Sequence, residues 1–457
     1  MAIVELVRNI LDTRFDALSD ERVDDAKNRM IDIVGCAIAG ANASGNSIVL
    51  DLIRGWGGSK EATILVHGDK VPAHNAAVMN SIMARSFDYE ATGPSPEGEV
   101  ADRTVGHNCC TTDPAALSVA ELKGSNGKEI ITSIILGGDI AVRISVAGDP
   151  GMSRGFDVTG TASTMGATAV AGRLWGLDEN QMVNAFGIVV DTIAGSFQGI
   201  MDGVHAFKLH GALSARNAIV AVELASKGFT GIKDPLESPA GYYTLYSKMA
   251  YPEHLTRDLG KVFHAKGRHK IHPSCYGNHS TIDAGLDVLR QRDIDIEDIA
   301  EVTLGVTPGS ARSNLAQPFE AGDSQQKALF SMRYSLANIL MRKEARIEHY
   351  TDEYVQDPKV IDLTRNIKLE PSVQSENRNT VEVTVKLKNG EVITGHAEKQ
   401  RGYLDNPLTK EEIIDKFWKC VDFSKTVSRQ NAEKALAMLE NLEEIDKISR
   451  IVDLLVV

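Results

Sequence analysis

The chain has 457 residues, more than one hydrophobic core usually holds, so we expect two or three domains. Its net charge is −13 and only 5% of its residues are aromatic. Nucleic acids require basic surfaces and stacking rings, so a nucleic-acid partner is not expected, and an anionic membrane surface would repel the chain in the same way. The five cysteines are an odd and sparse set, which is typical of a reducing cytoplasm.

The first 23 residues, MAIVELVRNILDTRFDALSDERV, place apolar side chains at helical spacing and carry charges every few positions. This pattern predicts an amphipathic helix and no signal peptide. The most apolar later stretch, residues 130–148, is interrupted by Asp139 and Arg143, so no membrane span is predicted. We therefore expect a cytoplasmic protein.

Up to about residue 266 the pattern is helical throughout. Residues 113–123 and 129–148 are apolar runs separated by GSNGKE, which predicts two helices joined as a hairpin. Many of the helices are apolar on nearly all faces and rich in small residues, as in a large bundle. The sequence therefore predicts an all-helical domain over residues 1–266.

After residue 266 apolar and polar residues alternate in IAEVTLGV and NTVEVTVKLKNGEVITGHAE, which predicts strands. Asn389-Gly390 indicates a hairpin with a type I′ turn, and helices are expected over residues 279–292 and 325–342. After Asn406-Pro407, Thr409 is an expected N-cap where helices resume. The predicted fold is mainly α. A discontinuous all-helical domain covers residues 1–266 and 403–457, and a smaller α+β lid covers residues 267–402.

No phosphate-binding loop is present in the sequence. GSNGKE lacks the first glycine and the hydroxyl residue of a P-loop, and no G-x-G-x-x-G follows a predicted strand. A nucleotide cofactor is therefore not expected.

The stretch RHKIHPSCYGNHSTID, residues 268–283, concentrates polar chemistry in one loop. Three interpretations compete with a structural role for its thiol: a zinc site from His272, Cys275 and His279, a nucleophile at Cys275, or a cradle for an anion. No second cluster of cysteine and histidine supports zinc. We favour the anion cradle, because the start of a predicted helix here attracts carboxylates.

The same loop carries a resemblance. KIHPSCYGNH resembles the K-x-x-P-x-C-x-x-x-H segment of the MmgE/PrpD family, which includes 2-methylcitrate dehydratase, cis-aconitate decarboxylase and iminodisuccinate epimerase. Other stretches that resemble the family in the same order are RSFDYEAT, GHNCCTTDPAALSVAE, RGFDVTGTASTMGATAVAGRLWGLD, FKLHGALSARNAIVAVELASKGFTG, ALFSMRYSLA and DNPLT.

The resemblance implies a helical domain, an α+β lid, an active site between them and a homodimer. It implies an enzyme that uses no nucleotide or metal and moves a proton next to a carboxylate of a small di- or tricarboxylate. The residues that match the family's functional positions are Asp88, His107, Lys208, His279 and Tyr334.

Imidazole titrates near neutral pH, so His107 is the expected base, oriented by Asp88. Lys208, His279 and the hydroxyl of Tyr334 are expected to stabilise the negative charge that forms when the proton leaves. A second pair of basic residues, Arg154 and Lys270, is expected to bind remote carboxylates of the substrate.

The sequence also departs from the family pattern. Asp157 replaces a histidine, and near a polycarboxylate it would repel the substrate unless it is paired, for example with Arg154, or acts as a base. Glu90-Ala91 replaces the usual acidic pair, and residues 91–103 form an insertion. Cys109 and Cys110 replace small hydroxyl residues. These changes indicate a substrate that differs from methylcitrate, either less negatively charged or carrying an amine that Asp157 or Glu90 could contact.

The leading hypothesis is a cofactor-independent lyase, a dehydratase or a decarboxylase. An isomerase that epimerises an amino- or imino-dicarboxylate is the first alternative, because it shares the proton-abstraction step. A family member that binds a ligand without catalysis is the second alternative.

Overall fold

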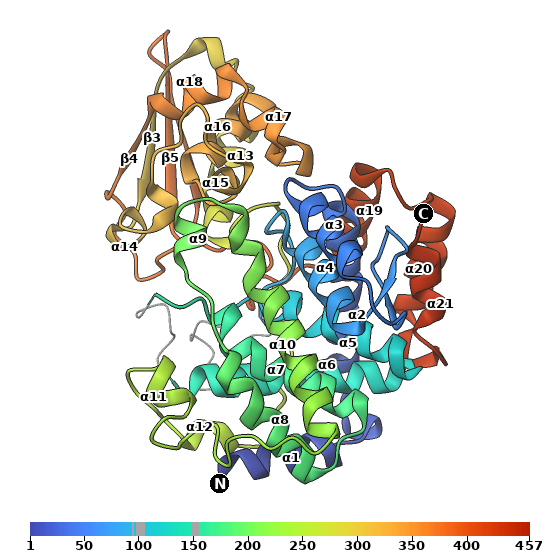
Figure 1. Ribbon diagram of the computed structural model, residues 1–457. Helices are drawn as coiled ribbons and strands as arrows, with labels where there is room; N and C mark the ends of the chain where they lie inside the picture. Colours follow the sequence, from blue (N-terminus) through green and yellow to red (C-terminus); the bar gives the residue numbers. More distant parts are fainter. Residues whose placement is uncertain (94–95, 97–105, 149–154) are drawn as a thin grey trace.

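The computed structural model describes residues 1–93, 96, 106–148 and 155–457. Figure 1 shows a large helical body and, above it, a smaller part built of helices and strands, so the predicted mainly α fold class is confirmed. The helices of the body are α1 (Ala2–Asp12), α2 (Asp20–Gly40), α3 (Asn46–Trp56), α4 (Ala73–Arg85), α5 (Cys109–Lys123), α6 (Gly127–Val146), α7 (Ala162–Trp175), α8 (Glu179–Val189), α9 (Gln198–Met201), α10 (Leu209–Ser226), α11 (Tyr242–Tyr246), α12 (Glu253–Thr256), α19 (Lys410–Ser424), α20 (Arg429–Glu440) and α21 (Ser449–Val452).

Local signals fix several helix ends of the body. Gly124 ends α5 in the left-handed region, with φ 68°. Asn126 then starts α6 with a capping box, in which its side chain accepts from the Glu129 amide and the Glu129 side chain accepts from the Asn126 amide. The predicted hairpin of two helices is therefore confirmed. The short strands β1 (Ala62–Thr63) and β2 (Lys70–Val71) form a small antiparallel ribbon at the edge of the body.

Glycines allow neighbouring helices of the body to approach closely. At the crossing of α6 and α7, a methyl group on Gly137 would lie 2.2 Å from Val170 Cγ2 and 2.7 Å from the Gly166 carbonyl oxygen. A methyl group on Gly166 would in turn lie 2.5 Å from the Gly137 carbonyl oxygen. The two backbones are therefore in direct contact, which explains why these helices are so rich in small residues.

We predict that Gly137→Ala lowers the free energy of unfolding by about 1–3 kcal/mol, because the added methyl group has no room. Gly55→Ala is the matched control, since Gly55 lies in α3 with no atom within 4 Å of the added methyl group. That variant should raise the stability by about 0.5–1 kcal/mol through helix propensity. Denaturant unfolding followed by circular dichroism measures both. Equal stability changes in the two variants would contradict the close contact.

The α+β part contains a four-stranded sheet with the order β4-β3-β5-β6, in which β3 and β4 are parallel and the other pairs are antiparallel. Residues in β5 alternate between buried and exposed, so one face of the sheet is covered and the other is open. A methyl group on Gly395 of β6 would lie 2.2 Å from the Ala284 carbonyl oxygen, so α13 lies directly on the covered face. The elements are α13 (His279–Gln291), β3 (Ile299–Val306), α14 (Pro308–Ala311), α15 (Gln325–Leu329), α16 (Met332–Arg342), α17 (Asp352–Val355), α18 (Pro358–Asn366), β4 (Ile367–Glu370), β5 (Val381–Leu387) and β6 (Val392–Ala397).

Two details of this part differ from the expectation. The helix expected over residues 325–342 is broken into α15 and α16, because Ser331 caps a new helix by accepting from the Tyr334 amide. The hairpin at Asn389-Gly390 is present, but its turn is not type I′: Gly390 alone has a positive φ, of 91°, and the Leu387 amide donates to the Glu391 carbonyl. The connection is therefore a hairpin loop longer than the two-residue type I′ turn, and a single glycine in it takes the left-handed conformation.

After the sheet the chain returns to the body, where α19 lies beside α2 in Figure 1. Thr409 starts α19 with a capping box that includes Glu412, as its sequence position predicted. A methyl group on Gly35 of α2 would lie 3.2 Å from Phe417 Cδ2 of α19, so these two helices are also closely packed. The domain limits at residues 266/267 and 402/403 stay a prediction.

Among the helices that the structure describes, none combines the length and the hydropathy needed to cross a membrane.

Candidate functional site

A buried pair of carboxylates lies in the loop that follows α4. Asp88 and Glu90 are both fully buried, and each forms an ion pair with Arg85, the last residue of α4. Glu90 Oε1 lies 2.9 Å from Arg85 Nη1. Asp88 has a φ of 47°, a left-handed conformation that is uncommon outside glycine and that often marks functional loops.

His107 lies directly before α5 and faces these carboxylates. Its Nδ1 donates to Glu90 Oε1 at 2.8 Å, and Asp88 Oδ1 is farther away, at 3.8 Å. The partner that orients His107 is therefore Glu90, not Asp88 as we expected from the sequence. The His107 side chain is 20% exposed, so the imidazole is the part of this cluster that another molecule can reach.

The environment keeps the His107 imidazole neutral. Burial and the nearby charge of Arg85 lower the pKa of His107 to about 4, although Glu90 opposes the shift. Burial would raise the pKa of Glu90, but Arg85 and the hydrogen bond from His107 hold it well below its usual value. With Nδ1–H bound to an ionised carboxylate, Nε2, which makes no hydrogen bond with a described residue, carries the lone pair and can accept a proton.

Lys270 brings the loop after residue 266 into the same cluster. Its Nζ lies 3.1 Å from Asp88 Oδ2 and also donates to the Asp88 carbonyl oxygen, and the side chain is fully buried. Burial lowers the pKa of Lys270 to about 8, against the effect of Glu90. Lys270, which we predicted to bind a remote carboxylate, therefore lies at the centre of the cluster.

His279, the first residue of α13, is fully buried next to this loop. Its ring lies 4.9 Å from Tyr276 and 5.2 Å from His272, measured between ring centroids. Neither of its ring nitrogens makes a hydrogen bond of ordinary geometry with a described residue. Burial lowers the pKa of His279 well below its usual value, so this imidazole is neutral and has unused donor and acceptor capacity.

Asp157 forms a second carboxylate–imidazole pair, which Thr159 links to His107. Its Oδ2 lies 2.9 Å from His210 Nδ1, and its Oδ1 accepts from the Thr159 amide at 2.8 Å. The Oγ1 of Thr159 also accepts from the His107 amide at 3.0 Å, which joins the two pairs. The partner of Asp157 that we predicted from the sequence, Arg154, lies outside the described residues.

The structure does not bring Lys208 into contact with this cluster. Its Nζ donates to the Ser44 carbonyl at 2.7 Å and to Asn46 Oδ1 at 3.0 Å. Burial lowers the pKa of Lys208 to about 7, and the carboxylate that acts on it is that of Asp352 in α17.

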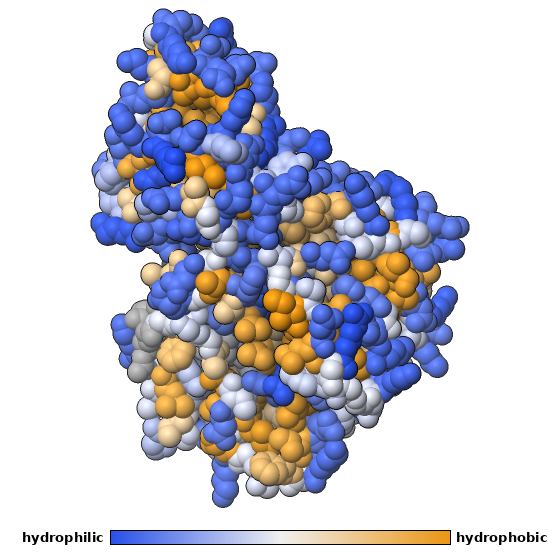
Figure 2. All heavy atoms as spheres, turned by 45° about the horizontal axis from the view of Figure 1, so that its top comes forward, coloured by the Kyte–Doolittle hydropathy of each residue, from blue (hydrophilic) through white to orange (hydrophobic). Residues whose placement is uncertain are grey.

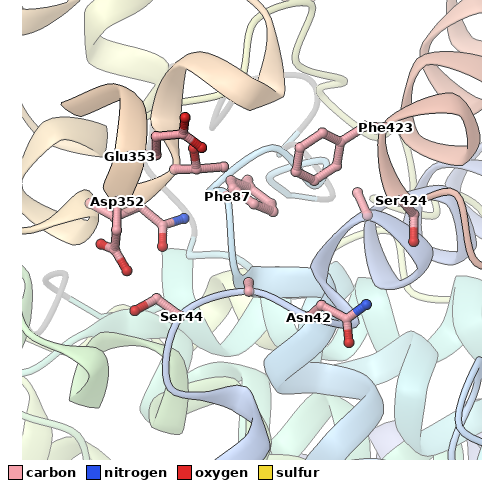
Figure 3. Close-up of a pocket in the computed structure, with 11 residues that line it drawn as sticks. Asn42, Ser44, Phe87, Asp352, Glu353, Phe423 and Ser424 are labelled. Atoms are coloured by element: carbon pink, nitrogen blue, oxygen red, sulfur yellow. The ribbon is translucent and has the colours of Figure 1, made fainter. Parts of the chain in front are cut away.

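A cavity of about 440 Å³ lies between the body and the α+β part (Figure 3). Phe87 lines this cavity, whereas the next residue, Asp88, pairs with Arg85 and Lys270. The same loop therefore contributes residues to the cavity and to the His107 cluster. The remaining lining residues are Ala39, Asn42, Ala43, Ser44, Gln325, Thr351, Asp352, Glu353, Phe423 and Ser424.

Tyr334 also lies apart from the cluster, in the interior of the α+β part. Its hydroxyl donates to the His349 carbonyl, and its ring packs between Phe319 and Tyr350 at centroid distances of 4.9 and 5.5 Å. Its side chain is fully buried. In this structure Tyr334 packs within the α+β part instead of facing His107.

Asp88, Glu90 and His107 are the one group among the described residues whose ligand atoms are close enough together for a metal ion. Both carboxylates, however, already pair with Arg85, and Lys270 lies 3.1 Å from Asp88. A divalent cation would meet two positive charges at its own binding position, so the donor set does not suit a metal. The zinc set proposed from the sequence does not form such a group within the described chain, and His272 pairs with Asp283 at 3.0 Å.

Two residues of the cluster, Arg85 and His210, were not predicted from the sequence, and Glu90 was considered only as a possible contact for a substrate amine, not as the partner of His107. Arg85 and Glu90 flank Asp88 in RSFDYEAT, so the density of charges in a loop next to a buried helix was the available signal. His210 follows Lys208 by two residues, but nothing in the sequence links it to Asp157, which is 53 residues away.

A neutral imidazole, held by an ionised carboxylate beside a buried ammonium group, is an arrangement that can transfer a proton. The sequence comparisons identify the family. Residues 4–254 match the MmgE/PrpD N-terminal domain and residues 272–444 match the MmgE/PrpD C-terminal domain. The chain belongs to the MmgE/PrpD family, as its motifs predicted.

Two curated relatives are similar along nearly the whole chain. Cis-aconitate decarboxylase of Homo sapiens is 22% identical over 461 residues, which cover 96% of this chain and 91% of that protein. Cis-aconitate decarboxylase of Mus musculus is 22% identical over 459 residues, which cover 96% of this chain and 90% of that protein.

We predict that kcat/KM depends on pH through His107 and Lys270. It should rise as pH passes about 4, where His107 loses its proton and becomes a base, and fall as pH passes about 8, where Lys270 loses its charge. Initial rates across this range measure both limits. The alkaline limit should be unchanged in Lys208→Arg, which cannot lose its charge; an alkaline limit that moves in this variant would assign it to Lys208 instead.

Proposed function

We propose that the protein is a lyase that takes a proton from carbon next to a carboxylate of a small organic acid and then expels water or CO2. The observation that carries this proposal is the His107 imidazole, neutral and bound through Nδ1 to the ionised Glu90. Its Nε2 accepts the proton. Lys270 and His279 are the groups available to stabilise the negative charge that then develops on the substrate.

The balance of charge in the cluster favours a substrate with few carboxylates. Arg85 and Lys270 supply two positive charges, and Asp88 and Glu90 cancel them. A tricarboxylate would find no excess positive charge among these four residues, whereas a dicarboxylate needs less compensation. The relatives in Homo sapiens and Mus musculus are both named for the decarboxylation of cis-aconitate, a tricarboxylate, so they support a lyase reaction on a small organic acid, and the smaller number of carboxylates rests on the charge balance alone.

An isomerase of an amino- or imino-dicarboxylate is the second candidate. The observation that favours it is the second imidazole, His210, which is also held by a carboxylate. A two-base epimerase uses one base to take the proton and a second acid to return it on the opposite face. The binding of a ligand without reaction is the remaining alternative.

The test of the proposed function compares the intact protein with His107→Gln on three acids: cis-aconitate, 2-methylcitrate and iminodisuccinate. We expect turnover of at least one acid and a fall in kcat of at least about 10²-fold in His107→Gln, the usual contribution of a general base. His396→Gln is the control, because His396 is exposed on β6. Proton NMR in D2O follows product formation and deuterium uptake together.

The possible outcomes separate the candidates. Product that lacks water or CO2 supports the lyase, and deuterium uptake without such loss supports the epimerase. Near-normal turnover in His107→Gln would remove His107 as the base. Exhaustive chelation should leave the rate unchanged, whereas loss of activity that zinc restores would contradict the metal-free site.

We also propose that the protein forms a homodimer in the cytoplasm, where its five free cysteines would stay reduced. Figure 2 shows apolar atoms gathered on one face of the helical body. Large apolar side chains exposed on the body include Leu209, Leu213 and Leu224 of α10 and Ile48 and Leu52 of α3, each with at least 36% of its surface accessible. A second copy of the chain would cover this face.

Leu213→Asp should therefore shift the protein from dimer to monomer, because a carboxylate would be buried in the apolar contact. Light scattering after size exclusion measures the mass. Val392→Asp is the control, since Val392 is 58% exposed on β6 in the α+β part. A dimer that persists in Leu213→Asp would place the interface elsewhere.

A further inference from the structure

The pair formed by Asp157 and His210 is built as an oriented proton carrier. Asp157 uses both of its oxygens, one for His210 Nδ1 at 2.9 Å and the other for the Thr159 amide at 2.8 Å. Each of the two side chains is 9% exposed. Because the carboxylate binds Nδ1–H, the imidazole is fixed in one tautomer, and Nε2 is the nitrogen left for another molecule.

The backbone around His210 leaves its ring little freedom. A methyl group on Gly195 would lie 3.3 Å from His210 Cδ2, and Gly195 has a φ of 133°, a conformation that few other residues adopt. The ring is therefore packed against bare backbone on this side. Its Nε2 makes no hydrogen bond within the described residues, although Nδ1 is fully used. A buried ring held so firmly, with one free nitrogen, is arranged for contact with a ligand.

The pair lies next to the His107 cluster. Thr159 contacts both, because its amide donates to Asp157 and its Oγ1 accepts from the His107 amide. Gly106 lies against the same residue, since a methyl group there would be 2.6 Å from the Thr159 amide nitrogen. The charges of Arg85 and His107 act on the Asp157 carboxylate, which places the pair within electrostatic reach of the cluster.

We propose that His210 is a second catalytic residue, whose Nε2–H donates a proton to the intermediate that forms after His107 has taken one. This inference rests on the proposed function. Asp157 is then a positioning residue, because it orients His210 and stabilises the imidazolium through Nδ1–H.

The proton and electron balance of the two steps is simple. His107 Nε2 takes the proton from carbon, and the electron pair of the C–H bond moves into the adjacent carboxylate. When that pair returns to form the double bond, the C–O bond to the hydroxyl group breaks, and the His210 proton joins the departing oxygen to give water. In a decarboxylation the C–C bond to the carboxylate breaks instead, CO2 leaves and its bonding electrons stay on the carbon skeleton, which then carries two electron pairs. The proton held by His107 returns to one carbon, and the His210 proton forms the new C–H bond at the other.

Kinetics in D2O separate His210 from His107. In a dehydration, His107→Gln should lose both deuterium uptake by the substrate and product formation. His210→Gln should keep the uptake and lose product formation by about 10²-fold. Asp157→Asn should show the same split to a smaller degree, whereas damage to the fold would lower both rates together. In a decarboxylation, product formation should fall about 10²-fold in His210→Gln, and His396→Gln should match the intact protein in either case. Normal product formation in His210→Gln would overturn the inference.

A second measurement does not depend on turnover. Diethyl pyrocarbonate modifies unprotonated imidazole nitrogens, so the reaction is run from about pH 6 to about pH 9, and mass spectrometry of peptides gives the rate at each histidine. His107 and His210 should both react in the free protein, and cis-aconitate, 2-methylcitrate or iminodisuccinate should protect both. Protection of His107 alone, or no reaction of His210 in the free protein, would overturn the inference and leave the proposed function standing. Absence of turnover and exchange with all three acids would overturn the proposed function, and protection of both histidines would then still support their contact with one ligand.

Discussion

One buried carboxylate, that of Asp32 in the middle of α2, holds together the segments on which the site depends. Its Oδ2 accepts from Lys416 Nζ at 2.8 Å and from His269 Nδ1 at 2.9 Å, and its Oδ1 accepts from the Ala91 amide at 3.0 Å. Burial alone would raise its pKa, but Lys416 and His269 lower the pKa of Asp32 to about 2. Loss of one member of such a buried pair typically costs about 3–5 kcal/mol.

The consequence for the site is direct, because two partners of Asp32 are next to site residues in the chain and the third contacts the residue between Asp88 and Glu90. Ala91 follows Glu90 in the loop, and His269 precedes Lys270. Lys416 also donates to the Tyr89 carbonyl at 2.5 Å and lies 4.0 Å from the centre of the Tyr89 ring. Contacts of the residues that follow Asp88 thus hold its left-handed conformation. They also keep the carboxylates of Asp88 and Glu90 buried beside Arg85 and away from solvent.

Local features of the sequence were sufficient for much of the fold. The capping boxes at Asn126 and Thr409 and the glycine at position 390 act within a few residues, so their elements were found at the predicted places. The break before α16 was missed, because residues 325–342 were expected to be one helical stretch, whereas Ser331 within it supplies a helix cap.

The candidate site was harder to predict, because its contacts join distant positions. His107 and Lys270 were found through motifs, and the structure brings both to Asp88 or Glu90. Whether His107 pairs with Glu90 or with Asp88 depends on the path of the backbone from residue 88 to residue 90. The pairing of Asp157 with His210 depends on how α10 packs. Tyr334 and Lys208 matched motifs equally well, yet their polar atoms bond elsewhere, to the carbonyls of His349 and Ser44. A motif gives residue types in order, and it does not give the direction of a side chain.

The helical body is assembled from both sides of the α+β part in the chain, and this has a consequence for biosynthesis. The ion-pair partner of Asp32 is Lys416, which lies 384 positions later in the chain. During translation the whole α+β part, which supplies His269 and Lys270, emerges before α19 exists. Until that helix is made, the carboxylate of Asp32 lacks its ammonium partner and the loop that bears Glu90 lacks its anchor. The nascent protein therefore acquires an ordered reaction centre late, in one of its final folding events on or after the ribosome.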